Sequence, residues 1–207
     1  MIKNNWLKRN FKDKYIYYVK KKKLRSRAWF KISEIQKHYK IFKPNMIVVD
    51  LGAAPGGWSK YASKKIGKNG YVIAYDIKKI NPIKNVICIV ENILNVNFIN
   101  KITNYIGYNS VNIVMSDISP NISGISSIDI PKSINLIKLV IKIIKNILKK
   151  GGICIIKIFQ GNNYEYYIKY ILNMFKKIKI FKPISSHSNS KEVYIIAFKF
   201  KFIKKFK

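Results

Sequence analysis

Short β-branched segments alternate with helix-like patterns along most of the chain. Between residues 131 and 150, isoleucine, valine and leucine recur at intervals of three and four, with lysines on the opposite side, which predicts a surface helix. Further helices are expected over residues 58–66 and near residues 163–176. Runs rich in β-branched and aromatic residues predict strands over residues 47–51, 71–76, 86–90, 111–115, 153–159, 178–182 and 193–200.

This alternation predicts an α/β fold, with a mostly parallel sheet of these seven strands and helices on both faces. The chain has 207 residues and 48% hydrophobic content, enough for one sizeable core. We find neither an internal repeat nor an interdomain linker, so we interpret residues 1–207 as a single domain.

A turn with few side chains, the glycine loop (residues 50–58), joins the first strand to the first helix. Gly52, Gly56 and Gly57 permit positive φ angles and a close approach to backbone, and Pro55 stiffens the turn. The spacing does not match the dinucleotide pattern G-x-G-x-x-G. It resembles instead the first motif of S-adenosylmethionine-dependent methyltransferases, D-x-G-x-x-P-G-G. An ordinary strand-to-helix turn is the alternative.

Polar residues stand where several predicted strands end. In open α/β sheets, ligands bind at the carboxyl ends of the strands, and Asp76, Asn92 and Asp117 all lie there. Asp76 follows the glycine loop by about 20 residues, the placement expected of an acid that binds ribose hydroxyls. Asn92 could hold an adenine through its amide, although an asparagine after a strand is more often a turn residue.

One lysine interrupts an otherwise apolar strand. Lys157 lies within residues 153–159, where a buried ammonium costs several kcal/mol unless it is paired or neutral. Desolvation and a neighbouring cation lower the pKa of an ammonium, so Lys157 is a candidate general base. If the last strand is antiparallel, Asp117 and Glu192 reach the same rim of the sheet. The alternatives are a solvent-facing lysine on an edge strand and a solvated glutamate.

The chain carries a formal net charge of +32, from 41 basic and 9 acidic residues. Such a field favours polyanions such as RNA, although the lysine content is also typical of A/T-rich codons. Arg25 and Arg27 stand out against the lysine background. They are interpreted either as donors that grip RNA phosphate or as solvated surface arginines. The lysine stripe of the helix over residues 131–150 is interpreted as a solvated face.

No apolar run reaches the length of about 18 residues that a membrane span needs, and the N-terminus lacks a secretory signal. We therefore expect a protein that is neither exported nor membrane-bound, in the cytoplasm, in an organelle such as the mitochondrion, or in the nucleus. Cys88 and Cys154 lack C-x-x-C spacing and histidine partners. They are predicted to be buried, reduced thiols, and no metal is expected.

Several segments, in order, resemble the FtsJ (RrmJ-like) family of ribosomal RNA large-subunit ribose 2′-O-methyltransferases. They are residues 13–15, 24–31, 50–58, 115–117, 129–131, 157–161 and 190–194. The resemblance implies a Rossmann-like methyltransferase fold with an antiparallel last strand, and S-adenosyl-L-methionine as cofactor. It implies a catalytic tetrad, which falls on Lys31, Asp117, Lys157 and Glu192. It also implies cofactor contacts by Gly56, Trp58, Asp76, Asn92 and Asp117, with Gly52, Pro55 and Gly57 in the same loop.

The resemblance further implies a monomer that acts on ribosomal RNA or the large subunit, with a uridine as the target. We expect a basic RNA-contacting segment over residues 1–45 and a catalytic core over residues 46–207. Asn92 stands where the family has an aspartate, which predicts weaker cofactor binding. Residues 186–190 are less rich in arginine than in relatives, so RNA affinity would depend on the lysines.

The alternatives are methylation of tRNA or mRNA-cap ribose, and a non-catalytic RNA-binding or ribosome-assembly protein. A small-molecule methyltransferase is disfavoured by the basic N-terminal segment.

Overall fold

The computed structural model describes residues 15–120, 126–161, 164–186 and 190–201; of residues 126–130 and 164 it describes the backbone alone. Three sequence-based assignments are affected by these limits. Residues 13–14 of the first family-like segment lie outside the described residues. The same holds for residues 187–189, within the arginine-poor stretch, and for the side chains of residues 129–130.

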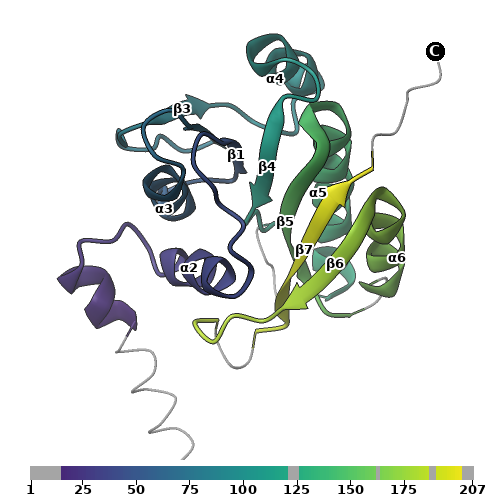
Figure 1. Cartoon of the computed structure of the whole chain (residues 1–207). Helices are drawn as coiled ribbons and strands as arrows, with labels where there is room; N and C mark the ends of the chain where they lie inside the picture. The colour runs from purple at the N-terminus through teal and green to yellow at the C-terminus, as the bar shows by residue number, and fades with distance from the viewer. Residues whose placement is uncertain (1–14, 121–125, 162–163, 187–189, 202–207) are drawn as a thin grey trace, which may run out of the picture.

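The chain builds one sheet with strand order β3-β2-β1-β4-β5-β7-β6 (Figure 1). Strand β7 runs antiparallel to both of its neighbours, and every other pairing is parallel. The strand order changes direction between β1 and β4. The predicted α/β fold, with its antiparallel last strand, is confirmed. The strands are β1 (Ile47–Leu51), β2 (Tyr71–Asp76), β3 (Val86–Val90), β4 (Val111–Ser116), β5 (Leu148–Phe159), β6 (Phe175–Phe181) and β7 (Glu192–Phe200).

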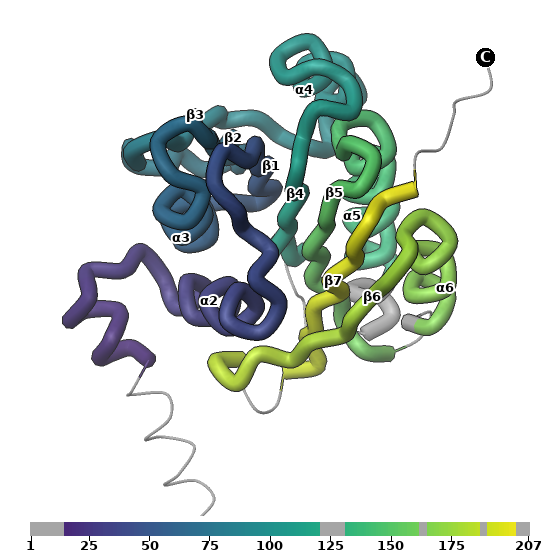
Figure 2. Tube along the Cα trace, in the orientation of Figure 1, coloured from purple at the N-terminus to yellow at the C-terminus, as the bar shows by residue number. Residues whose placement is uncertain are grey.

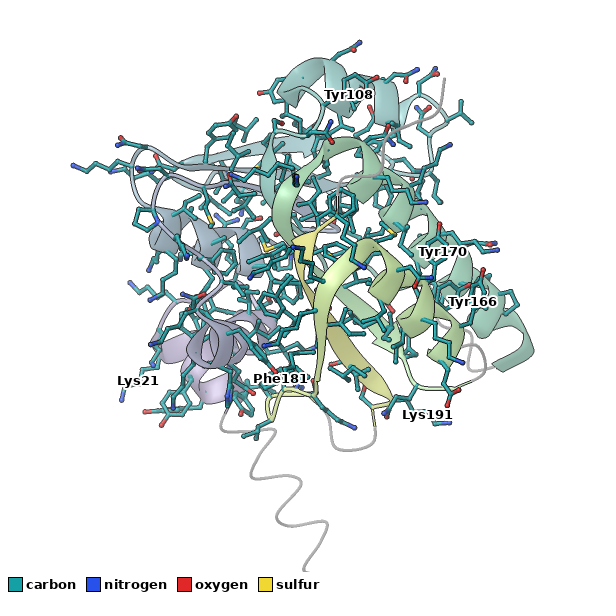
Figure 3. The ribbon with its side chains drawn as sticks, turned by 45° about the vertical axis from the view of Figure 1, so that its right-hand side comes forward. Lys21, Tyr108, Tyr166, Tyr170, Phe181 and Lys191 are labelled. Carbon is teal, nitrogen blue, oxygen red and sulfur yellow. The ribbon has the colours of Figure 1, made fainter. Side chains whose placement is uncertain are left out.

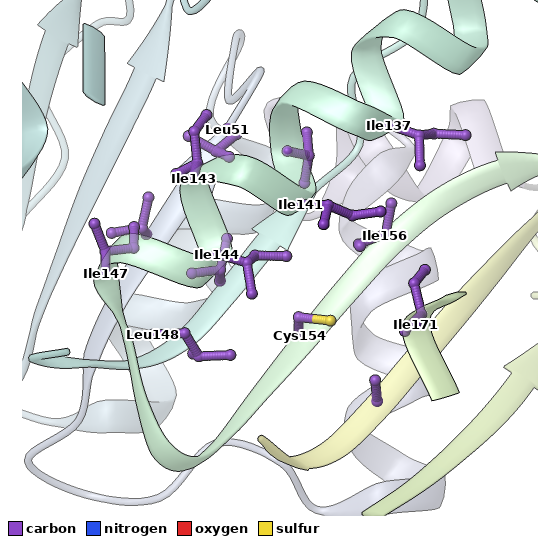
Figure 4. Packing of buried hydrophobic residues seen from close by; sticks show 14 of the residues in the cluster. Leu51, Ile137, Ile141, Ile143, Ile144, Ile147, Leu148, Cys154, Ile156 and Ile171 are labelled. Carbon is purple, nitrogen blue, oxygen red and sulfur yellow. The ribbon is translucent and has the colours of Figure 1, made fainter. Parts of the chain in front are cut away.

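Helices cover both faces of the sheet (Figure 2). Because successive strand residues point to opposite faces, Val48 packs in the core beneath α2 and α3, and Val49 in the core beneath α4, α5 and α6. Figure 4 shows the second of these cores, where Ile137, Ile141 and Ile144 of α5 lie over β5. The helices are α2 (Ala28–Tyr39), α3 (Gly57–Ile66), α4 (Phe98–Ile106), α5 (Ser126–Ile147) and α6 (Tyr164–Met174).

The end of α5 differs from the sequence-based prediction. The helix ends at Ile147, and β5 already begins at Leu148, ahead of the glycine pair at 151–152. Leu148 pairs with Val111, but the next pair along the strands is Ile153 with Ile113, so β5 carries extra residues in a bulge. Lys149 therefore belongs to the strand and not to the helix. The bulge interrupts the alternation of apolar and polar residues that is typical of a strand. The helical spacing in the sequence therefore predicts a helix that continues to residue 150.

The lysine stripe of α5 divides into two kinds of residue. Lys138 and Lys142 are exposed, as expected of a solvated face. Lys145 instead donates a 2.8 Å hydrogen bond to the hydroxyl of Tyr170, and the Tyr170 ring stacks on that of Tyr166 with centroids 6.3 Å apart. Figure 3 shows the two tyrosines side by side on α6. Two of the three lysines of the stripe that lie in α5 are thus exposed surface, and Lys145 joins α5 to α6.

Both cysteines are free thiols, but they differ in burial. Cys154 is buried, as predicted, whereas Cys88 is only half-buried. Desolvation raises the pKa of each thiol. Within the described part of the chain, no helix has the length and apolar content needed to cross a membrane.

Candidate active site

The glycine loop leaves β1 at the point where the strand order reverses. Gly52 and Gly56 have φ angles of 74° and 97°, which residues with a Cβ rarely adopt. The peptide bond between Ala54 and Pro55 is cis. A Cβ at Gly52 would overlap the side chain of Ile118, and one at Gly57 would lie 2.5 Å from Ser26 Oγ. The sequence suggested bare backbone for a ligand. The structure shows that Gly52 and Gly57 also leave space for the side chains of Ile118 and Ser26.

A cavity of about 240 Å³ lies beside this loop. Its wall combines the loop, which includes Asp50, with Asp117 and with residues of the N-terminal segment. The lining residues are Ser26, Arg27, Ala28, Lys31, Asp50, Gly52, Ala53, Ala54, Pro55, Gly57, Trp58 and Asp117. Lys31 and Asp117 of the tetrad are therefore in the same cavity as the glycine loop.

Asp50 contributes a buried acceptor to this cavity. It is 1% exposed, and its Oδ2 accepts a 2.5 Å hydrogen bond from Ser59 Oγ, while Oδ1 has no hydrogen-bond partner among the described residues. Burial raises the pKa of the Asp50 carboxyl to about 7, and the charges of Asp117 and Asp76 add to the rise. Ser26 Oγ is a second buried polar atom without a described partner. A carboxylate and a hydroxyl in one cavity suit the ammonium and carboxylate of an amino-acid ligand.

Asp76 ends β2 and Asn92 follows the end of β3 by two residues, close to the predicted places, but each already has a backbone partner. Asp76 Oδ2 accepts a 2.8 Å hydrogen bond from the amide of Ala54, so the carboxylate holds the glycine loop. Asn92 Oδ1 accepts from the amide of Leu94 at 3.0 Å, the turn interaction that the sequence left as the alternative. Neither residue lines the cavity of about 240 Å³.

The four residues of the tetrad converge from α2, the end of β4, β5 and the start of β7. Lys31 Nζ lies 2.5 Å from Glu192 Oε1, and Lys157 Nζ lies 3.0 Å from Asp117 Oδ1. Lys31 and Lys157 are each 9% exposed. Strand β5 is interior to the sheet, so Lys157 is not the solvent-facing edge residue of the alternative interpretation. Each buried lysine is paired with a carboxylate.

Tyr194 joins the two ion pairs, a role that the sequence did not reveal. Its hydroxyl accepts from Lys31 Nζ at 3.2 Å and donates to Asp117 Oδ1 at 2.8 Å. The register of β5 and β7 places Tyr194 opposite Lys157. Burial and the neighbouring carboxylates raise the pKa of Tyr194 far above its ordinary value, so the hydroxyl keeps its proton. Its ring lies 5.6 Å from that of Trp58, which connects the tetrad to the glycine loop.

Glu192 is ionised in this arrangement. Burial acts to raise the pKa of its carboxyl, but the hydrogen bond and charge of Lys31 outweigh burial and hold the pKa below its usual value. Ser186 Oγ donates a further hydrogen bond of 2.8 Å to Oε1. Lys31 and Ser186 therefore both contact an ionised carboxylate.

Both arginines of the N-terminal segment bind the protein's own backbone. Arg25 donates to the carbonyls of Pro55, Asn81 and Pro82 at 3.1, 2.8 and 2.8 Å. Arg27 donates to the carbonyl of Ser185 at 2.6 Å. The sequence left open an RNA grip or a solvated surface for these residues, and the structure shows internal hydrogen bonds instead.

Helix α2 holds the loop between β6 and β7 with one stripe of side chains. Arg27, Lys31 and Glu34 are spaced by four and three residues, so they share a face of the helix. The carboxylate of Glu34 accepts from the amides of Ile184 and Ser185 at 2.7 and 3.1 Å. This stripe fixes the loop that leads to Glu192. It could not be found from spacing alone, because its partners lie about 150 residues away.

A seven-stranded sheet of this order, with a glycine loop and a ligand cavity where the order reverses, defines the protein as an S-adenosylmethionine-dependent methyltransferase. Residues 24–200 match the family described as FtsJ-like methyltransferase, and the chain belongs to that family.

The chain is similar along almost its whole length to proteins named "Ribosomal RNA large subunit methyltransferase E". The one from Buchnera aphidicola subsp. Cinara cedri is 50% identical over 194 residues, which are 94% of this chain and 93% of that protein. The one from Wigglesworthia glossinidia brevipalpis is 50% identical over 201 residues, 97% and 98% of the two chains. A crystal structure from Plasmodium falciparum, of a protein assigned to the ribosomal RNA methyltransferases, superposes with a TM-score of 0.73 at 28% identity. The match covers 85% of this chain and 98% of that one.

Proposed function

We propose that this protein transfers the methyl group of S-adenosyl-L-methionine to the ribose 2′-hydroxyl of a uridine in large-subunit ribosomal RNA. The observation that carries the proposal is the pair of buried ion pairs beside the glycine-loop cavity, Lys31 with Glu192 and Lys157 with Asp117. The proposed substrate, large-subunit ribosomal RNA, comes from the names of relatives that match this chain over nearly their full length.

The cavity fits the methionine part of the cofactor, which, when bound, supplies an electrophilic methyl group on a sulfonium. The Oδ1 of Asp50, which has no partner among the described residues, suits its ammonium, and Ser26 Oγ suits its carboxylate. Asp76 is proposed to bind the ribose hydroxyls and Asn92 the adenine. Asp117 is proposed to lie near the methyl donor. The loop residues proposed to contact the cofactor are Gly52, Pro55, Gly56, Gly57 and Trp58.

Lys157 is proposed as the general base that takes the proton of the 2′-hydroxyl. Lys157 can take this proton only as the neutral amine, and the ammonium that then forms has Asp117 Oδ1 as its partner, 3.0 Å from Nζ. Lys31 places the nucleotide, and Glu192 fixes Lys31 through the 2.5 Å ion pair. Because catalysis of this transfer is mostly alignment plus removal of one proton, a rigid set of paired side chains suits it.

The RNA is proposed to bind through the positive field of the chain, which carries a net charge of +32. We propose one methyltransferase domain, with an RNA-contacting segment over residues 1–45 and a catalytic core over residues 46–207, acting as a monomer without a metal. The full-length relatives come from the bacteria Buchnera and Wigglesworthia, which favours action in a bacterial cytoplasm over a mitochondrion or nucleus.

Methyl transfer from labelled S-adenosyl-L-methionine tests the proposal, with isolated large subunits, naked ribosomal RNA, tRNA and capped mRNA as separate substrates. We expect label in large-subunit RNA, on the 2′-oxygen of a uridine when the site is mapped. Label in tRNA or cap ribose alone would instead support the alternative substrates. No label in any RNA, with RNA binding intact, would favour a non-catalytic ribosome-assembly protein.

A further inference from the structure

Arg25 lies outside the tetrad and does not line the cofactor cavity, but it touches two loops beside that cavity. Its guanidinium reaches the carbonyl of Pro55 in the glycine loop. It also reaches the carbonyls of Asn81 and Pro82, in the segment over residues 77–85 that follows β2. One side chain therefore ties together the chain segments that leave β1 and β2.

The glycine loop is held from two sides. The carboxylate of Asp76 binds the amide of Ala54, and Arg25 binds the carbonyl of the next residue, Pro55. The stem of Arg25 also lies against Gly56, where an added Cβ would be 3.3 Å from Arg25 Cδ. Ala54 and Pro55 both line the cavity. Displacement of the guanidinium would therefore remove one of the two side-chain hydrogen bonds that hold the backbone of Ala54 and Pro55.

The geometry of the guanidinium suits an arginine that binds carbonyls of two loops at once. Nη1 donates to carbonyls of both loops, and Nη2 to one further carbonyl, with donor-to-acceptor distances between 2.8 and 3.1 Å. A planar fork can serve several acceptors at once, which the single point of a lysine ammonium does less well. The residue is half-buried, and its guanidinium donates all three of these hydrogen bonds to carbonyls of the protein itself.

We propose that Arg25 is a positioning residue for S-adenosyl-L-methionine: it shapes the glycine loop for the cofactor and does not grip RNA. The inference rests on the proposed function only in taking this cofactor as the ligand of the cavity. Arg25, a residue of the basic N-terminal segment, thus contributes to the affinity for the cofactor.

The test measures cofactor binding calorimetrically in the full chain, without RNA and without turnover. Arg25→Ala is expected to weaken S-adenosyl-L-methionine by about tenfold, and Arg25→Lys by less, since an ammonium replaces part of the hydrogen bonding. Lys20→Ala is the matched control, because it removes one charge from an exposed position of the same segment. The control should bind the cofactor like the wild type.

RNA affinity and kinetics separate the two possible roles. Arg25→Ala should lose no more RNA affinity than Lys20→Ala does, and its kcat at saturating cofactor should stay within about twofold of the wild type, while the KM for cofactor rises. Unchanged cofactor affinity in Arg25→Ala would overturn the inference, as would an equal loss of cofactor affinity in Lys20→Ala. If the alanine variant does not fold, Arg25→Lys and Arg25→Gln are held to the same criterion. Failure of the wild type to bind the cofactor would instead refute the proposed function.

Discussion

The glycine loop and the tetrad meet in one cavity but are built in opposite ways. The loop is a single run, residues 50–58, and much of its surface toward the cavity comes from small residues held in place by hydrogen bonds to their backbone. The tetrad draws one charged side chain from each of four segments between Lys31 and Glu192. Backbone contacts tolerate many side-chain changes, whereas a set of buried charges does not. Single substitutions should therefore be most damaging in the tetrad.

The two aspartates of the cavity show the same contrast. Asp117 Oδ1 lies 3.0 Å from Lys157 Nζ and accepts a 2.8 Å hydrogen bond from the Tyr194 hydroxyl. Asp50 has a buried oxygen without a described partner and a pKa raised to about 7. One acid is satisfied by the protein itself, and the other is poised for a ligand to satisfy it.

The largest effect is expected from Lys157→Ala. Loss of a general base lowers the rate of proton transfer, so kcat should fall by at least about a hundredfold. Binding of S-adenosyl-L-methionine should survive, because Lys157 does not line the cavity of about 240 Å³. Single-turnover methyl transfer and calorimetry measure the two quantities. Lys191→Ala, at an exposed lysine next to Glu192, is the control. Near-normal turnover in Lys157→Ala would refute the assignment.

The second effect is a pH dependence of cofactor affinity that Asp50 should produce. If the ammonium of the cofactor binds the ionised carboxylate, affinity should rise by about tenfold between pH 6 and pH 8, because the pKa is about 7 before binding. Asp50→Asn keeps the shape but cannot ionise, so its affinity should be lower at pH 8 and flat across this range. A wild-type profile as flat as that of the variant would exclude the contact.

The same carboxyl should alter stability with the opposite sign. A folded pKa above the unfolded value of 3.8 means that the cofactor-free protein loses stability as the pH rises from about 4 through 7. Asp50→Asn should therefore unfold at a higher temperature than the wild type at pH 8 when the cofactor is absent. Equal melting temperatures at that pH would contradict the raised pKa.

A smaller effect is expected from Tyr194→Phe. The variant removes the hydroxyl that links Lys31 to Asp117 but keeps the ring beside Trp58. Losing one hydrogen bond to a charged group should lower kcat by about tenfold, since the two ion pairs are then free to shift. Cofactor affinity should be unchanged. An unaltered kcat would show that each ion pair is positioned without the bridge.

The smallest effect is expected from the exposed lysines of α5. Lys138→Ala combined with Lys142→Ala removes two solvated charges and no described contact. Cofactor affinity and kcat should not change, and RNA affinity should fall by no more than about twofold at physiological salt. A steep loss, with a shallower dependence of RNA binding on salt, would instead identify this face as an RNA track.

Some elements of this protein were decided locally and were therefore predictable. Strand β1 matches the predicted range, and α3 begins one residue early, because alternating burial and a glycine-rich turn are written in neighbouring residues. Helix α2 was missed: lysines and polar residues interrupt its short apolar stripe, and Lys31, Ile32 and Ile35 are buried only because α2 packs on the rest of the protein. The sequence patterns do not predict α4 at residues 98–106 either.

The sequence alone determined the order of the seven strands along the chain and the position of the glycine loop, and family motifs singled out the four candidate residues of the tetrad, since each depends on contiguous patterns. Only the tertiary structure decided which partner each charge takes. Arg25 is 30 residues from Pro55 and 57 from Pro82, and Lys31 is 163 from Tyr194. Hydrogen bonds and ion pairs act over a few ångströms whatever the sequence separation, so their partners exist only once the sheet has brought distant strand ends together.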